Sequence, residues 1–218
     1  MIRLFCVLIG YLLGMISCSY IVGKLHGVDI RKHGSGNLGA TNTMRALGKK
    51  AGFLVMFLDF AKVVIAVVIV RLLFSEAYAN EKFFLQSYTL LGCILGHDFP
   101  FYLKFKGGKG CACIGGFAIF FYPYVAMVLA TLFAILLIIT KYISLGTMFL
   151  YVSFTAVIIF CGQTGRLEAD QNHLPEIYAI YLFLIVITII RHRSNIKRII
   201  DGNENKTYLI KKMKKNEE

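Results

Sequence analysis

Long apolar runs separated by short connectors restrict this chain more than any other feature of its sequence. A helix needs roughly 20 mainly apolar residues to cross a bilayer. Six windows qualify, namely residues 4–23, 51–74, 83–103, 111–140, 142–161 and 174–190. Hydrophobic residues make up 57% of the 218-residue chain, and its mean hydropathy of +0.68 lies far above the range of soluble domains. We therefore predict an all-α, polytopic integral membrane protein.

The window 111–140 decides the number of crossings, because it is too long for one upright helix and short for two. Four basic connectors hold 19 of the 24 Lys and Arg residues: 24–50, 104–110, Lys141 and 191–218. If the chain turns at Pro123 and crosses twice, all four connectors lie on one side, as the cytoplasmic preference of Lys and Arg requires. We therefore predict seven transmembrane helices, with the N-terminus outside and the C-terminus cytoplasmic. The two central helices are expected to be short, tilted or partly re-entrant.

Other readings of the composition are less favoured. The formal charge of +12 does not indicate a nucleic-acid partner, because the basic residues lie in connectors and the tail rather than on one polar face. The first apolar run is longer than the core of a signal peptide, so an uncleaved span is expected. The six cysteines form no paired C-x-x-C units and are predicted to be buried reduced thiols rather than metal ligands. We assign residues 1–200 to one membrane domain and residues 201–218 to a basic cytoplasmic tail.

Polar segments between the apolar windows carry the candidate chemistry. Three stand out, "GSGNLGATNTMR" (34–45), "GHDFPFYLKFKGGKG" (96–110) and "RHRSNIKRIIDGNE" (191–204), and "KYISLGT" (141–147) joins them. Glycine allows a positive φ and close approach of the backbone to a ligand, and a helix start adds its dipole. Residues 34–45 therefore resemble a phosphate cradle, with Arg45 able to grip oxygens in a bidentate way. An ordinary basic loop would explain the charge but not the repeated glycine, serine and asparagine.

Isolated ionisable residues have simpler interpretations. His97 is expected to be a hydrogen-bonded structural residue at a helix end, with a catalytic role as the alternative. Asp59 and Lys62, three residues apart in an apolar span, are expected to neutralise each other. His192 and Asn195 have the same spacing, which would place them on one face of a helix. The "KGGKG" stretch lacks the P-loop spacing, so nucleotide binding is not predicted.

In this order and at these intervals, the three motifs closely resemble those of the bacterial acyl-phosphate:glycerol-3-phosphate acyltransferases, the PlsY-type family. The resemblance implies a seven-helix enzyme of the bacterial cytoplasmic membrane with its active site on the cytoplasmic face. It would transfer a fatty acyl group from acyl phosphate to the sn-1 hydroxyl of glycerol 3-phosphate, releasing phosphate and 1-acylglycerol 3-phosphate. The resemblance implies no cofactor, no metal and no thioester donor, and a monomer is expected to suffice.

The resemblance, together with the cradle hypothesis, selects the candidate site residues. The catalytic candidates are Ser35, Arg45, His192 and Asn195. The substrate-binding candidates are Gly34, Gly36, Asn37, Thr41, Asn42, Gly107, Gly108, Lys109, Ser144 and Thr147. Structural roles are expected for His97 and, from the resemblance, for Glu204. Thr147 replaces the second serine of a short family motif but keeps its hydroxyl, and Leu38, where relatives often have proline, is expected to loosen the first loop without abolishing activity.

The proton acceptor for the attacking hydroxyl is left open between two groups. No histidine is followed by an acid five residues later, and no carboxylate–histidine pair is visible. Either His192 or a substrate phosphate, whose second pKa is about 6, could take the proton. Ser35 as a covalent nucleophile is disfavoured because no base is identifiable beside it. A secondary transporter of an anionic metabolite is the alternative function, disfavoured because the polar motifs lie at one face and no internal repeat is present.

Overall fold

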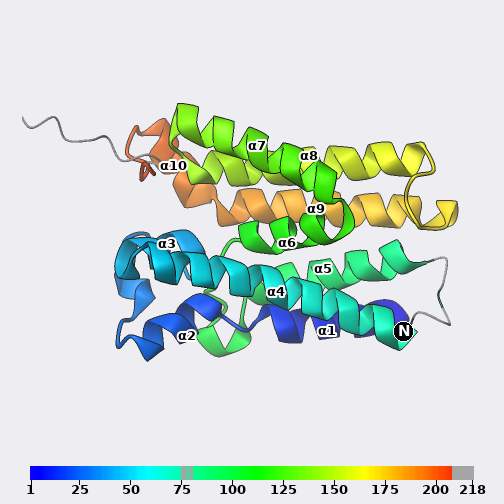
Figure 1. Cartoon of the computed structure of the whole chain (residues 1–218), viewed down its shortest axis with the longest axis horizontal. Helices are drawn as coiled ribbons and strands as arrows, with labels where there is room; N and C mark the ends of the chain where they lie inside the picture. The colour runs from blue at the N-terminus through cyan, green and yellow to red at the C-terminus, as the bar shows by residue number, and fades with distance from the viewer. Residues whose placement is uncertain (75–77, 79–80, 208–218) are drawn as a thin grey trace, which may run out of the picture.

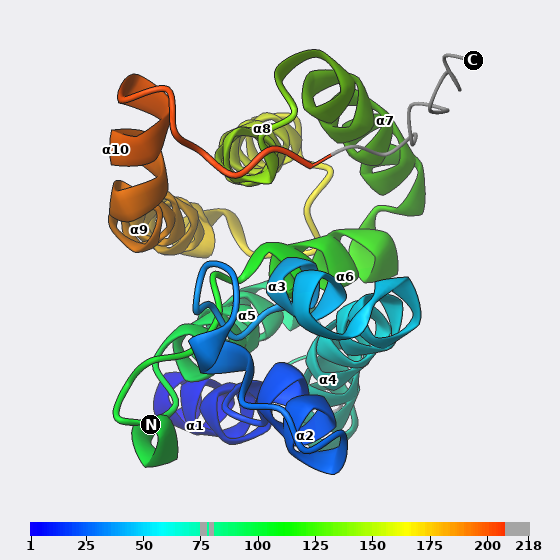
Figure 2. The same cartoon turned by 90° about the vertical axis from the view of Figure 1, so that its left-hand side faces the viewer.

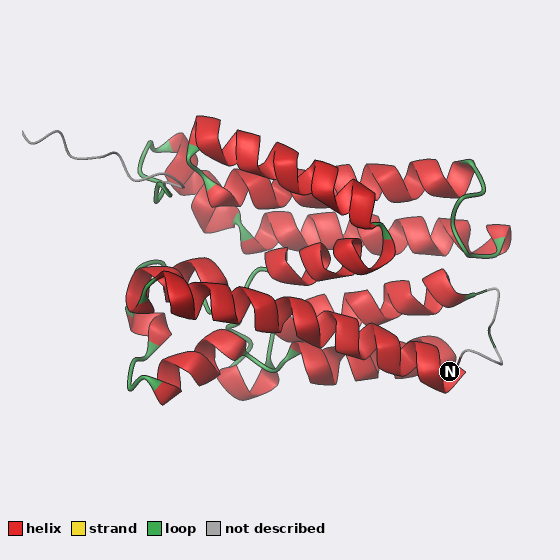
Figure 3. Ribbon diagram, viewed as in Figure 1, coloured by secondary structure: helices red, strands yellow, loops and turns green. Residues whose placement is uncertain are grey.

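The computed structural model describes residues 1–74, 78 and 81–207, and the regular structure of these residues is entirely helical (Figures 1 and 3). The α-helices are α1 (Ile2–Gly14), α2 (Cys18–Leu25), α3 (Ala40–Leu47), α4 (Lys49–Phe74), α5 (Lys82–Asp98), α6 (Cys111–Phe121), α7 (Pro123–Thr140), α8 (Ile143–Gln163), α9 (Leu174–Arg191) and α10 (Arg193–Ile200). Short 3₁₀ turns, η1 (Ile30–Lys32), η2 (Phe101–Leu103) and η3 (Gln171–His173), lie in the connectors.

Five helical segments of the described residues are long and apolar enough to cross a membrane. They are Ile2–Leu25, Lys49–Phe74, Pro123–Thr140, Ile143–Gln163 and Gln171–Arg191. Helix α5 has 17 residues, and α6 has 11. At 1.5 Å per residue α6 is about 16 Å long, roughly half the thickness of the hydrocarbon core. One of the two central helices is therefore short, as the length of the window 111–140 suggested.

The helices form two groups with α6 between them (Figures 1 and 2). Helices α1, α2, α3, α4 and α5 make one group, and α7, α8, α9 and α10 make the other. Helix α6 contacts α4 and α5 on one side and α7 and α8 on the other. The main hydrophobic core runs through this middle layer and includes Phe83, Phe117, Phe154 and Tyr181, which are fully buried. All six cysteines are free thiols; five are buried, as predicted, and Cys111 is half-buried.

Glycines set the close packing of α1 against α5. Gly10 and Gly14 on α1 face Gly92 and Gly96 on α5, and both pairs have the small-xxx-small spacing of tightly packed membrane helices. A Cβ atom at Gly10 would lie 2.2 Å from the carbonyl oxygen of Thr89, and the other three positions are equally tight. These backbones therefore touch directly, which holds the end of α5 that carries the polar motif in a defined position.

A buried polar cluster crosses this helix group near the break between α1 and α2. Lys62 lies 2.8 Å from the carboxylate of Asp59, so the ion pair expected from the sequence is present. The Lys62 ammonium also donates to the carbonyl oxygen of Ile16 at 3.0 Å and to Nδ1 of His97 at 2.9 Å. Satisfying the Ile16 carbonyl in this way stabilises the break in the first span, since an unpaired carbonyl would be costly there. His97 is thereby held in a structural position.

The chain reverses direction at Pro123, as the charge distribution suggested. Tyr122 ends α6, and Pro123 is the first residue of α7, where its missing N–H costs nothing. Figure 1 shows α6 and α7 running in opposite directions, with their turn short of the far ends of α8 and α9. All four basic connectors consequently meet at one end of the molecule, as far as the described residues extend.

Candidate active site

The four polar segments converge at the end of the molecule that faces the viewer in Figure 2. Side-chain hydrogen bonds that join them run from Lys109 to Asn195, from Ser144 to Glu204 and from Arg45 to Thr207. Residues 201–207, which the sequence assigned to a tail, thus contact the site through Glu204 and Thr207. Residues 208–218 of that predicted tail lie outside the described part of the chain.

The first polar segment is a tight loop closed by an asparagine. Gly34 and Gly36 have φ values of 54° and 68°, a region that favours glycine. Asn42 Oδ1 accepts a hydrogen bond from the backbone N–H of Ser35 at 2.9 Å, and its Nδ2 donates to two further carbonyl oxygens of the loop at 2.9 and 3.1 Å. Because Asn42 is 2% exposed and makes three bonds within the protein, it shapes the loop rather than presenting a free amide to a ligand.

This loop presents its catalytic candidates outward. Ser35 and Arg45 are exposed, while Asn37 on the loop and Thr41 in the first turn of α3 are half-buried. Arg45 Nη2 donates to the hydroxyl of Thr207 at 3.3 Å. Partial burial lowers the pKa of Arg45 from its ordinary value, but a guanidinium remains cationic near neutrality. These side chains are therefore accessible to an anionic ligand at the surface of the loop.

Leu38 anchors the loop instead of loosening it, so that expectation was wrong. Its side chain is 2% exposed and packs in a small core with Ile30 and Leu103. Burial of a leucine side chain contributes about 1.5–3 kcal/mol relative to exposure. The apolar contact thus holds the loop where proline would have done so by restricting φ.

The glycine loop of the second motif folds back on the end of α5. The N–H of Gly107 donates to the carbonyl of Asp98 at 3.1 Å, and the N–H of Gly108 donates to the carbonyl of His97 at 2.9 Å. A Cβ atom on Gly108 would lie 2.0 Å from His97 Nε2. Both backbone donors are therefore used inside the protein, and the glycines are needed for close approach rather than for a nest of N–H groups. The loop that they form leads directly into Lys109.

Arg191, which the sequence did not single out, holds the same loop from the other side. Its Nη2 donates to the carbonyl oxygens of Gly107 at 3.1 Å and Gly108 at 2.7 Å, and its Nε donates to Gly108 at 3.2 Å. The guanidinium also stacks over Phe99, 5.0 Å from the ring centroid. Only its place in the basic "RHR" triplet could have drawn attention to it, and that triplet also fits an ordinary basic connector.

Glu204 connects the third motif to the other segments, as expected of a structural residue. One carboxylate oxygen accepts from Asn195 Nδ2 at 2.6 Å and from the Ser144 hydroxyl at 3.3 Å. The other accepts from Arg198 Nε at 2.7 Å. Glu204 is 8% exposed, so these charge-assisted bonds are shielded from water. Asn195 in turn accepts from Lys109.

Lys109 is a partly buried cation whose hydrogen bond goes to an amide oxygen. Burial, reinforced by repulsion from Arg198 and Arg191, lowers the pKa of Lys109 to about 8. Its acceptor is the Oδ1 of Asn195, a neutral group that does not cancel the charge. Such an ammonium is suited to bind a phosphate dianion, which would restore a higher pKa.

His192 is fixed as one tautomer. Its Nδ1 lies 2.8 Å from the carbonyl oxygen of Thr188, which can only accept, so Nδ1 carries the proton and Nε2 has a free lone pair in the neutral ring. Burial is the main cause that lowers the pKa of His192 to about 4, and Lys109 adds to it. The imidazole is therefore neutral at pH 7 and can accept a hydrogen bond at Nε2.

The two hydroxyl residues at the start of α8 face inward. Ser144 donates to Glu204, and Thr147 Oγ1 donates to the carbonyl oxygen of Ile143 at 3.0 Å. Both are buried, at 4% and 1% exposure. Ser144 thus supports the network around Glu204, whereas Thr147 bonds within its own helix.

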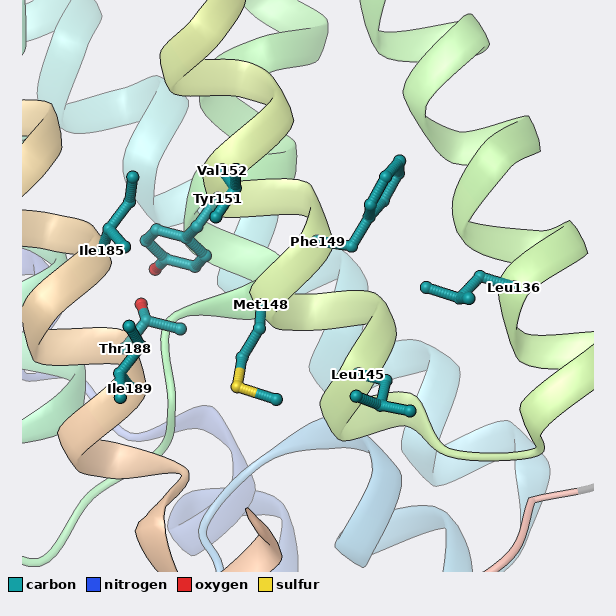
Figure 4. A pocket seen from close by; sticks show the side chains of 9 residues that line it. All are labelled: Leu136, Leu145, Met148, Phe149, Tyr151, Val152, Ile185, Thr188 and Ile189. Atoms are coloured by element: carbon teal, nitrogen blue, oxygen red, sulfur yellow. The ribbon is translucent and has the colours of Figure 1, made fainter. Parts of the chain in front are cut away.

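An apolar cleft of about 380 Å³ opens between α7, α8 and α9 (Figure 4). It is lined by Leu136, Leu145, Met148, Phe149, Tyr151, Val152, Ile185, Thr188 and Ile189. Thr188 links the cleft to the polar site, because its carbonyl oxygen binds His192. The sequence could not indicate this cleft, since its lining residues are indistinguishable from those that face lipid.

Known proteins are similar to this chain in sequence and in fold. The family model "Glycerol-3-phosphate acyltransferase" matches residues 4–202. A glycerol-3-phosphate acyltransferase of Thermosipho melanesiensis is 36% identical over 217 residues, covering 98% of each chain. One of Bacillus cytotoxicus is 38% identical over 209 residues, covering 95% of this chain and 96% of the relative.

Two solved structures are similar along nearly the whole chain. Both are of PlsY, described as an integral membrane glycerol 3-phosphate acyltransferase. The glycerol 3-phosphate form superposes with a TM-score of 0.78 at 34% identity, covering 94% of this chain and 96% of that one. The lysophosphatidic acid form gives 0.76 at 33% identity, covering 94% and 95%.

Proposed function

Because the chain belongs to the glycerol-3-phosphate acyltransferase family, it is an integral membrane enzyme that acylates glycerol 3-phosphate for phospholipid synthesis, and we propose that acyl phosphate is its donor. Family membership leaves the alternative of a transporter without support. The observation that carries the choice of donor is an apolar cleft whose lining residue Thr188 is hydrogen-bonded to His192 of the polar site through its carbonyl oxygen. A fatty acyl phosphate combines an apolar chain with an anionic head, and this site offers a place for both.

Positive charge allows two phosphorylated substrates to meet. Lys109 and Arg45 lie on different segments of the site, and Arg198 adds a third cation that is only partly offset by Glu204. Electrostatic stabilisation by positioned cations is worth most where water is partly excluded. We assign Lys109 to the phosphate of glycerol 3-phosphate and Arg45 to the acyl phosphate. Ser35 and Asn195 are assigned to orient the reacting groups.

The transfer needs no covalent enzyme intermediate, since acyl phosphate is already an activated mixed anhydride. The sn-1 hydroxyl oxygen forms a bond to the acyl carbon, the bond from that carbon to the phosphate oxygen breaks, and phosphate leaves. The hydroxyl proton goes to a phosphate oxygen, whose second pKa is about 6. The low pKa of His192, about 4, makes it the weaker acceptor. His192 Nε2 is therefore assigned to orient glycerol 3-phosphate by accepting a hydrogen bond from its second, non-reacting hydroxyl group.

The acyl chain is assigned to the cleft between α8 and α9. The cleft begins at Thr188, next to His192, and its remaining lining is apolar. A chain lying there leaves its carbonyl carbon near the imidazole and its far end toward lipid.

The active site is assigned to the cytoplasmic face of a bacterial cytoplasmic membrane, with seven crossings that include α5 and the α6–α7 pair. The basic connectors meet at the site, whereas acidic residues lie at the other helix ends: Glu81 before α5, Glu168 and Asp170 between α8 and α9, and Glu176 in the first turn of α9. Lys and Arg favour the cytoplasmic side. Cysteine labelling from outside should reach positions 81 and 170 but not 35 or 195. Labelling of position 195 from outside would show that this position is external and would contradict the assigned orientation.

The donor is tested with purified protein in detergent. We expect palmitoyl phosphate and glycerol 3-phosphate to give 1-palmitoylglycerol 3-phosphate and phosphate in equal amounts, with a metal chelator present throughout. Palmitoyl-coenzyme A serves as the matched donor with the same chain. Activity with the thioester alone would exclude acyl phosphate as the donor.

A further inference from the structure

Arg191 makes a contact that no catalytic step described above uses. It lies at the end of α9, immediately before His192, and three of its hydrogen bonds go to backbone carbonyls of the glycine loop. Two guanidinium nitrogens thus grip two consecutive carbonyl oxygens. A planar fork of donors suits this task, and the single ammonium of lysine does not.

The loop is clamped between two layers. On one side, the N–H of Gly107 donates to the carbonyl oxygen of Asp98, and the N–H of Gly108 donates to that of His97. On the other side, Arg191 donates to the carbonyl oxygens of Gly107 and Gly108. Each of the two glycine residues is therefore held through both its N–H and its C=O, and the three consecutive peptide units from residue 106 to residue 109 each take part in at least one of these bonds. The next residue along the chain is Lys109, which has little freedom once these units are held.

The buried carboxylate of Asp98 explains why a cation, the Arg191 guanidinium, holds the glycine loop. Its carboxylate is fully buried, and neither oxygen makes a hydrogen bond with the residues that the structure describes. Arg191 Nε lies 4.0 Å from Asp98 Oδ2. A buried, unbonded carboxylate is costly unless a charge compensates it. Arg191 thus faces two partners, a carboxylate that stabilises its position and a loop that it holds.

We propose that Arg191 is a positioning residue for glycerol 3-phosphate, acting by holding the Gly107–Gly108 carbonyls so that Lys109 reaches the substrate phosphate. Arg191 does not touch the phosphate in this scheme. Its role rests on the proposed function only in that glycerol 3-phosphate is the ligand of Lys109.

Binding of glycerol 3-phosphate to the full-length protein, measured calorimetrically without any donor, separates this role from the choice of donor. We expect Arg191→Met to raise the Kd by about tenfold or more, the scale of losing charged hydrogen bonds. Arg193→Met is the matched control, because Arg193 is exposed and two residues away, and its Kd should equal that of the unaltered protein. Lack of binding by the unaltered protein would instead refute the proposed function and, with it, the role of Arg191.

A second variant separates positioning from charge compensation. Arg191→Met leaves Asp98 uncompensated, so the double variant Arg191→Met/Asp98→Asn should recover thermal stability but keep the raised Kd. Recovery of both would mean that Arg191 only compensates Asp98 and would overturn the role. Arg191→Lys keeps the charge and loses the fork, so it decides the matter if Arg191→Met does not fold. A Kd equal to that of the unaltered protein in Arg191→Lys would also overturn it.

A double-mutant cycle with Lys109 tests whether Arg191 acts through that residue. If it does, Arg191→Met should add little to the loss already caused by Lys109→Met. If the increase in Kd in the double variant equals the product of the two single increases, Arg191 contacts the ligand independently and the positioning role is refuted.

Discussion

The affinity for glycerol 3-phosphate is expected to fall as pH rises through about 8, because Lys109 loses its proton there. Burial is the largest cause of this low pKa, and repulsion from Arg198 and Arg191 adds to it. The sign follows from the chemistry: below pH 8 the ammonium attracts the phosphate dianion, and above pH 8 the neutral amine does not. If only the protonated form binds, the Kd rises about tenfold between pH 7 and pH 9.

The assay is calorimetric binding of glycerol 3-phosphate across pH 6.5 to 9.5, without donor, so that alkaline hydrolysis of acyl phosphate does not interfere. Lys109→Arg is the matched variant. Its guanidinium stays protonated throughout this range, so the alkaline rise in Kd should disappear whatever the affinity at pH 7. A rise that persists in Lys109→Arg, or that is absent from the unaltered protein up to pH 9.5, would refute the reasoning.

Three further outcomes are expected. His192→Ala should chiefly raise the KM for glycerol 3-phosphate, by about tenfold, because His192 orients the substrate while a phosphate oxygen takes the proton. The pH–rate profile of the unaltered protein should show no limb near pH 6.5 that this variant lacks, because the pKa of His192 is about 4; such a limb would show instead that His192 accepts the proton. Gly108→Ala should raise the KM for glycerol 3-phosphate in steady-state assays, since its Cβ would lie 2.0 Å from His97 Nε2, whereas Gly115→Ala, whose Cβ would lie 3.4 Å from its nearest neighbour, should not. Met148→Trp should lower kcat/KM for palmitoyl phosphate more than for dodecanoyl phosphate by occupying the cleft, and equal losses would exclude the cleft as the chain site.

The sequence alone was sufficient for most helix positions, because the signal for a membrane helix is local. The windows 51–74, 142–161 and 174–190 agree closely with α4, α8 and α9. Backbone groups in lipid must be satisfied within the helix, so apolar length and helical structure go together. The reversal at Pro123 was also predictable. Proline favours the first position of a helix, and a reversal there places all the basic connectors on the same side of the membrane.

Two helix boundaries depended on tertiary contacts. The first window is broken between α1 and α2, where Lys62 from a different helix binds the carbonyl of Ile16. The window 83–103 ends as a helix at Asp98, after which the chain folds back so that the 107–108 peptides bond to the carbonyls of His97 and Asp98. Lys62 lies far from Ile16 in the sequence, so no local pattern could show that contact. The helix end near His97 was expected, but the return of the glycine loop to its carbonyl groups was not.

The composition of the site was predictable, but the role of each residue was not. The motifs identified Lys109, His192 and Asn195 by type and spacing. The structure decided that Asn42 closes a loop, that the N–H groups of Gly107 and Gly108 are already used, and that Arg191 holds them. A residue type defines which hydrogen bonds a side chain or peptide can make. Which of them are left for a substrate depends on neighbours far along the chain, and only the packing of α5, α8 and α9 brings those neighbours together.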